Sequence, residues 1–176
     1  LVGIMGNTGS HTNKITMIPQ LYPFTKFYEE ELEACWCRGM YELSETFALR
    51  CSEFEFLLNS KLVGLSTCRF LFHEIIDTDG NELVDKFEVM CLICLASALS
   101  NTRKVQMLFD LFNLNDKGYL VESEISLLIL SVARVVEKVD AKWPVPAKPA
   151  WLHMVQLSLK HFAKVDSTKQ SLRKPE

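Results

Sequence analysis

Asp77-Thr-Asp-Gly-Asn-Glu-Leu-Val-Asp-Lys-Phe-Glu88 is a twelve-residue stretch whose oxygen-bearing side chains fall at positions 1, 3, 5, 9 and 12. Hard cations such as Ca²⁺ take about six to eight oxygen ligands, and a loop with this spacing supplies them. The alternative is an acidic surface turn that has the spacing by chance. The predicted ligands of a single calcium site are Asp77, Asp79, Asn81, the Leu83 carbonyl, Asp85 and a bidentate Glu88.

The residues after this stretch favour the metal-binding interpretation. Val89, Leu92, Ile93 and Ala96 recur at helical spacing, as expected if Glu88 opens a helix. Position 6, where glycine is usual, holds Glu82. A residue with a side chain at positive φ costs roughly 1 kcal/mol, so we expect a weakened but functional site.

An earlier segment, 42–53, has the same length but poorer ligands. Phe47 stands at position 6, and Ser44 and Thr46 replace carboxylates. We therefore expect a helix-loop-helix unit without metal. Leu49 and Val84 both occupy position 8, which predicts that the two loops pair through short strands.

A third unit follows about 36 residues after the second, and a fixed period indicates a repeated helix-loop-helix. Gly118 and Leu120 suit positions 6 and 8, but Lys117 and Val121 offer no oxygen ligand at positions 5 and 9. Affinity follows ligand charge and number, so an empty or very weak site is expected. Its vestigial ligands would be Asn113, Asn115, Tyr119 and Glu124.

The C-terminal part begins with a proline-set linker, 143–149, that cannot be helical. Asp166 then reads as position 1 of a fourth, degenerate loop. Because the sequence ends at Glu176, before position 12, we expect the fourth unit to be truncated.

Composition narrows the class of protein. With 176 residues and 48% apolar content, the chain can bury a core as one or two small lobes. A net charge of −3 without a basic stripe argues against nucleic acid as a partner. The longest apolar run, 89–99, is about half the length of a bilayer crossing, so no transmembrane segment is predicted.

Two local motifs leave alternatives open. The six cysteines are interpreted as reduced, mostly buried thiols, although Cys-x-Cys and Cys-x-x-Cys spacing would also suit zinc.

The segment from Met5 has the form of an N-myristoylation signal if translation starts there. Membrane contact is expected only if Gly6 is lipidated.

On these loops and their apolar frames, the chain resembles the calmodulin superfamily of EF-hand proteins over roughly residues 28–176. The extended segment between the third and fourth units is similar to the group of calcineurin B, neuronal calcium sensors and calaxin. The resemblance implies an all-α fold of paired EF-hand units in two lobes with short paired loop strands. The expected organisation is an irregular segment 1–27, a first pair 28–100 and a second pair 101–176.

The resemblance also implies function. We expect that the protein is not an enzyme. We expect a cytoplasmic, calcium-binding regulatory or adaptor protein, whose apolar surface binds an amphipathic helix or another polypeptide. The alternative is a constitutive structural subunit of a larger assembly, such as a ciliary or axonemal microtubule complex. The expected partner-binding residues are Phe72, Met90, Leu92, Leu127, Leu130, Trp143 and Trp151.

Overall fold

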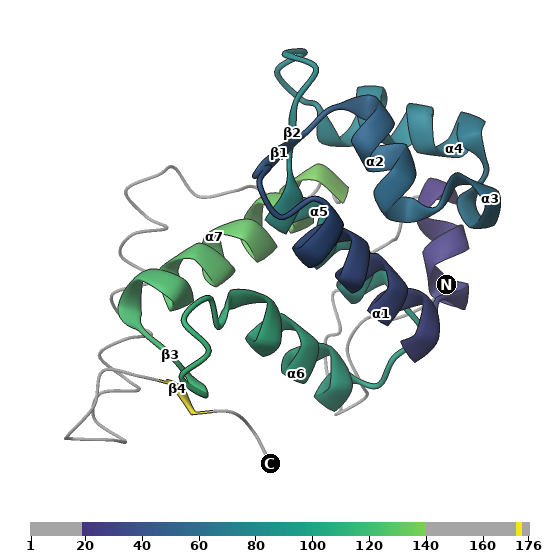
Figure 1. Ribbon diagram of the computed structural model, residues 1–176. Helices are drawn as coiled ribbons and strands as arrows, with labels where there is room; N and C mark the ends of the chain where they lie inside the picture. The colour runs from purple at the N-terminus through teal and green to yellow at the C-terminus, as the bar shows by residue number, and fades with distance from the viewer. Residues whose placement is uncertain (1–18, 140–171, 174–176) are drawn as a thin grey trace, which may run out of the picture.

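The fold is all-α, as predicted from the sequence, and is consistent with the EF-hand fold (Figure 1). The computed structural model describes residues 19–139 and the backbone of residues 172–173. Gly6, the 143–149 linker, Trp143, Trp151 and most of the predicted fourth loop lie outside the described residues.

Short helices and two π-helical segments build the first half of the described chain. Both π segments directly precede the first and second loops, where one wider turn ends the incoming helix. The elements are η1 (Pro19–Lys26, 3₁₀), α1 (Glu29–Cys37), η2 (Arg38–Glu42, π), β1 (Ala48–Leu49), α2 (Cys51–Leu58), α3 (Ser60–Val63), α4 (Leu65–Phe70), η3 (Leu71–Ile76, π), β2 (Val84–Asp85) and α5 (Lys86–Ala96).

Longer helices follow in the second half. Ser100 caps the first of them, since its hydroxyl accepts a hydrogen bond from the Arg103 amide at 3.3 Å. The elements are α6 (Asn101–Phe112), β3 (Tyr119–Leu120), α7 (Glu122–Val139) and β4 (Leu172–Arg173).

The segment 19–26 is helical, which corrects the prediction of an irregular segment up to residue 27. Leu21, Phe24 and Phe27 recur every third residue, which is the repeat of a 3₁₀ helix, and all three are buried. The Phe24 and Phe27 rings meet edge to face with centroids 5.4 Å apart. The Ala98 amide donates to the Phe27 carbonyl at 3.0 Å, which ties this segment to the end of α5.

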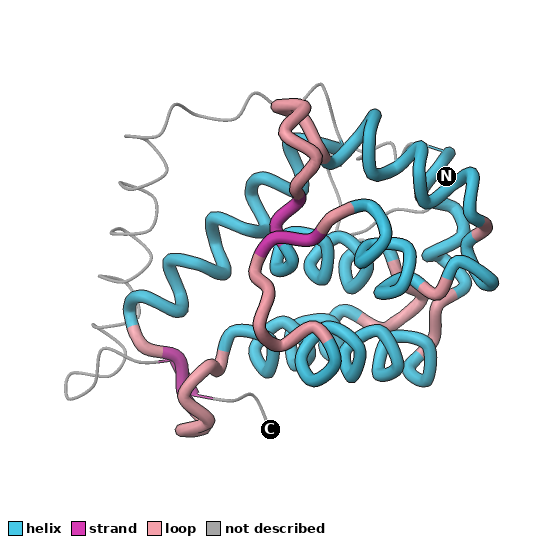
Figure 2. Tube along the Cα trace, turned by 45° about the horizontal axis from the view of Figure 1, so that its top comes forward, coloured by secondary structure: helices cyan, strands magenta, loops and turns pink. Residues whose placement is uncertain are grey.

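Strand pairing between the first two loops is confirmed. β1 and β2 are antiparallel, with Leu49 opposite Val84 and Ala48 opposite Asp85 (Figure 2). Both position-8 side chains are buried, so the pairing is anchored in the core. The first loop thus supports the second, as its sequence predicted.

The third loop pairs with β4 one residue before position 8 of the predicted fourth loop. A fourth loop starting at Asp166 would place Arg173 at position 8. Leu172 instead pairs with Leu120. An apolar residue thus occupies the paired position, as Val84 does opposite Leu49.

Helix α5 lies at the centre of the described chain, between α1, α6 and α7 (Figure 1). Every residue of α5 except Leu95 is buried, which explains its almost continuous apolar sequence. Three stacked rings extend this packing: Phe87 lies between Phe47 of the first loop, at 6.1 Å, and Phe112 of α6, at 5.4 Å. One hydrophobic core therefore joins residues from both predicted pairs.

Candidate metal centre

The first half of loop 77–88 directs its side-chain oxygens inward. Asp77 Oδ1 and Asp79 Oδ1 both accept from the Asn81 amide, at 3.1 and 3.3 Å, and Asp77 Oδ2 accepts from the Glu82 amide at 3.0 Å. Asn81 Oδ1 accepts from the Leu83 amide at 2.8 Å. The candidate metal-ligand oxygens at positions 1, 3 and 5 are therefore gathered around one turn.

The backbone of this turn has the left-handed residues that such a loop needs. Gly80 and Glu82, at positions 4 and 6, have φ values of +66° and +60°. Asp116 and Gly118 occupy the same positions in loop 113–124, with φ values of +51° and +71°. Glu82 thus adopts the conformation in which a side chain costs roughly 1 kcal/mol.

Asp85, the predicted ligand at position 9, is also the N-cap residue of α5. Its Oδ1 accepts from the Glu88 amide at 3.0 Å. Burial raises the pKa of this carboxyl, and the nearby Glu88 charge acts in the same direction. The side chain is thus held beside the first turn of α5.

Glu88 at position 12 points out of the loop toward α7. Its Oε1 accepts from Arg134 Nη1 at 3.0 Å and its Oε2 accepts from Lys138 Nζ at 2.7 Å. The Glu88 side chain is only 4% exposed, against 16% for Lys138 and 58% for Arg134. Within 19–139, no three acidic, histidine or cysteine side chains converge as a metal site in this conformation.

The corresponding glutamates of the other two loops turn the opposite way. Glu53 Oε2 accepts from the Arg50 amide at 2.7 Å, and Glu124 Oε2 accepts from the Val121 amide at 2.8 Å. Each carboxylate thus reaches back to the amide of position 9 in its own loop, as in a capping box. Glu88 is the exception among the three.

Loop 113–124 satisfies its polar groups largely by itself. Asn115 Nδ2 donates to Glu124 Oε1 at 3.0 Å, and Asn115 Oδ1 accepts from the Lys117 amide at 3.0 Å. Asn113 Oδ1 is buried and has no hydrogen-bond partner among the described residues. Tyr119, the other predicted vestigial ligand of this loop, lies in β3.

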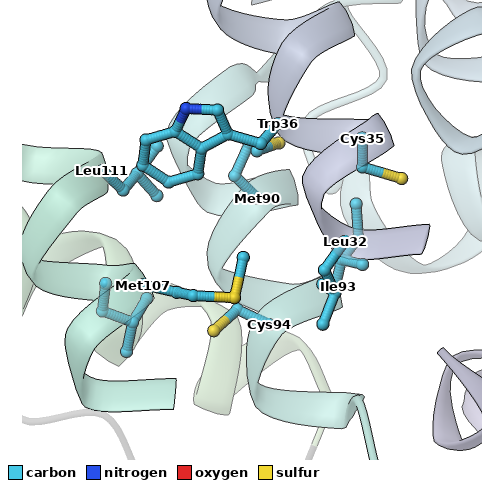
Figure 3. A pocket seen from close by; sticks show the side chains of 9 residues that line it. Leu32, Cys35, Trp36, Met90, Ile93, Cys94, Met107 and Leu111 are labelled. Carbon is cyan, nitrogen blue, oxygen red and sulfur yellow. The ribbon is translucent and has the colours of Figure 1, made fainter. Parts of the chain in front are cut away.

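The predicted partner-binding residues of the first half are part of the core. Phe72, Met90 and Leu92 are all buried, so they do not form an exposed surface in this conformation. Met90 borders a small apolar cavity of about 10 Å³ between α1, α5 and α6, beside Trp36 (Figure 3). On α7, Leu127 and Leu130 are half-buried.

The prediction from sequence missed Arg134 and Lys138. They are the only basic residues of α7, and their i, i+4 spacing places them on one face of the helix. That spacing is visible in the sequence. Their partner is not, because Glu88 lies 46 and 50 residues away along the chain.

The six cysteines are free thiols distributed over several helices. Burial raises the pKa of Cys94 to about 11 and that of Cys91 well above its ordinary value. The cysteines are not gathered into one site, so the zinc alternative gains no support. None of the described helices is both long and apolar enough to cross a membrane.

The chain is similar to visinin of Gallus gallus, with 27% identity over 137 residues. The aligned region covers 75% of this chain and 69% of visinin. No protein-family model matches the chain.

Proposed function

We propose that this protein is a calcium-binding EF-hand regulator, with one calcium site in loop 77–88. The supporting observation is that carboxylates at positions 1 and 3 converge on a turn whose positions 4 and 6 both have positive φ. Similarity to visinin over three quarters of the chain agrees with the EF-hand resemblance.

The residues fit calcium in type and number. Asp77, Asp79 and Asn81 would hold the ion from the turn, with the Leu83 carbonyl, Asp85 and Glu88 completing an all-oxygen set. The bound ion would supply the positive charge that makes close approach of these carboxylates favourable. Glu88 must first turn inward, as Glu53 and Glu124 already do.

Calorimetric titration with Ca²⁺ tests the site directly. We expect one site per chain, with Mg²⁺ as the comparison ion. Glu88→Gln should remove most of the affinity because it deletes the bidentate ligand. The matched control is Glu53→Gln, which changes the same position of the metal-free first loop. Two or more equivalent sites, or unchanged binding in Glu88→Gln, would refute the assignment.

We further propose that metal binding exposes an apolar surface for an amphipathic helix of another polypeptide. Phe72, Met90 and Leu92 are buried here, so they become available only if the helices around α5 separate. Trp143 and Trp151 would add to this surface. The test is binding of a hydrophobic dye, which should increase when Ca²⁺ replaces chelator.

A constitutive structural subunit is the second candidate. The closed core and the ion pairs of Glu88 favour it, because both stabilise the fold without metal. Dye binding that is identical with Ca²⁺ and with chelator would support this role. A place in a ciliary microtubule assembly stays a prediction.

A further inference from the structure

We propose that Arg134 and Lys138 compete with the metal ion for Glu88, so that helix α7 sets the calcium affinity of loop 77–88. The inference rests on the proposed calcium-binding function and adds two residues to it. Both residues lie outside every loop.

The competition follows from the hydrogen bonds of the Glu88 carboxylate. One oxygen is bonded to Arg134 at 3.0 Å and the other to Lys138 at 2.7 Å. A bidentate ligand needs both oxygens, so Glu88 cannot close the loop while these bonds are intact. Charge-assisted bonds of this kind are stronger than neutral ones, particularly where little water reaches them.

The other two loops show which orientation the fold gives in the absence of these cations. Glu53 and Glu124 also stand at the third residue of a helix, and both turn back to the amide of position 9. Glu88 has the same place at the start of α5 but a different partner. Two differences accompany this change of partner. Position 9 is the acidic Asp85, where the other loops have Arg50 and Val121. The cations of α7 are the groups that hold both oxygens of Glu88.

The packing of α7 on α5 explains why both cations reach Glu88. A small apolar cleft of about 10 Å³ borders the Glu88–Lys138 contact. It is lined by these two residues together with Ile75, Ile76, Leu92, Val135 and Val139. This cleft joins η3, which leads into the calcium loop, to the end of α7. Asp85 is the other acidic group near Arg134.

The coupling must be reciprocal. If the bonds from α7 weaken metal binding, then the inward orientation of Glu88 weakens the attachment of α7 to the same degree. Leu127 and Leu130, two of the predicted partner-binding residues, lie on this helix. The contact thus gives loop 77–88 a physical route to a surface outside the first helix pair.

The test compares calcium affinity in wild type and in Arg134→Gln/Lys138→Gln by calorimetry. Without the competing bonds, affinity should rise about 10-fold, the effect of roughly one charge-assisted hydrogen bond. The conservative exchange Arg134→Lys/Lys138→Arg keeps both cations and should retain wild-type affinity. Arg134→Gln alone changes the more exposed partner and serves if the double variant does not fold.

The charge control is Arg69→Gln/Arg103→Gln, which removes two cations that pair with Glu55 and Glu29. Its affinity should stay within about twofold of wild type, because these charges are exposed and screened. Hydrogen exchange gives a second measurement: amides of α7 should exchange faster with Ca²⁺ than with chelator in wild type, and equally in the Gln/Gln variant.

Equal affinity in wild type and Arg134→Gln/Lys138→Gln would overturn the competition while leaving the calcium site intact. An equal gain in the charge control would also overturn it, because the effect would then be nonspecific. Absence of binding in every variant would overturn the proposed function and this inference with it. Binding that appears only in the Gln/Gln variant would support the competition but contradict calcium binding by the wild-type protein.

Discussion

Loops 77–88 and 113–124 turn at the same two positions, with Gly80 and Glu82 in one and Asp116 and Gly118 in the other at positive φ. Their side chains differ. The first has carboxylates at positions 1, 3 and 9, and the second has amides at 1 and 3 and a valine at 9. Backbone geometry and ligand chemistry are therefore separable in this protein.

The twelfth residue sharpens the contrast. The loop with the better ligands has its glutamate bonded to α7, whereas the loop with the poorer ligands has its glutamate already turned inward. Each loop thus lacks one requirement that the other meets. Exchanging these requirements between the loops tests the comparison.

The largest expected effect is a new metal site in loop 113–124. Carboxylates at positions 1, 3 and 9 with an amide at position 5 should give calcium binding in the range of ~10⁻⁵–10⁻³ M, because turn and glutamate are in place. Calorimetry in a Glu88→Gln background assigns any binding to the new site. No binding there would mean that the turn and the inward Glu124 do not predispose the loop to bind metal. The changes are Asn113→Asp, Asn115→Asp, Lys117→Asn and Val121→Asp.

Truncation of the leucine at position 8 in the first or the third loop should give the next largest effect. Leu49 and Leu120 are both completely buried, so Leu49→Ala and Leu120→Ala should each cost about 2–4 kcal/mol of unfolding free energy. Urea denaturation measures this cost. Only Leu49→Ala should also weaken calcium binding, because Leu49 pairs with Val84. Equal weakening by Leu120→Ala would show that the loops are not independent.

Local patterns predicted much of this fold. The apolar periodicity after Glu88 gave α5, and loop spacing gave the register of Leu49 with Val84, because both depend on residues close in sequence. The direction of the Glu88 side chain could not be read in this way. It depends on Arg134 and Lys138, which reach it only through the packing of α7 on α5.

The helix at 19–26 was missed for a different reason. Prolines such as Pro19 and Pro23 are typical of irregular chain, and an α-helical period does not fit Leu21, Phe24 and Phe27. A period of three residues does fit them. Searching for that shorter period would have predicted both the helix and its buried face.

A smaller effect is expected from exchanging residues at position 6. Glu82→Gly should tighten calcium binding a few-fold, because relief of roughly 1 kcal/mol of strain exceeds the loss of a screened carboxylate. Gly118→Ala should destabilise the fold by about 1 kcal/mol because its φ is +71°. No atom of the described residues lies within 4 Å of the added Cβ, so no clash adds to this strain. Calorimetry measures calcium binding by Glu82→Gly, and thermal melts measure the stability of Gly118→Ala. Weaker binding by Glu82→Gly would show that charge limits the site.

The smallest effect is expected from an ion pair outside both loops. Arg103 Nε donates to Glu29 Oε1 at 2.7 Å between α6 and α1, but both side chains are substantially exposed. Arg103→Gln should therefore change the unfolding free energy by less than about 1 kcal/mol and leave metal binding unaltered. A larger loss in a denaturant titration would mean that exposed charges contribute as much as the Glu88 contacts do.

Phe47 makes the first loop harder to restore by mutation than the third. Phe47 stands at position 6, but its φ is not positive. Its ring stacks on Phe87, and Lys86 Nζ lies 5.6 Å from its ring centroid. Glycine there would reopen the turn but expose the Lys86 stem and the Phe87 face. The third loop is a few substitutions from a working site, whereas the first must also replace a structural contact. Engineering a metal site is therefore a shorter mutational path in the third loop than in the first.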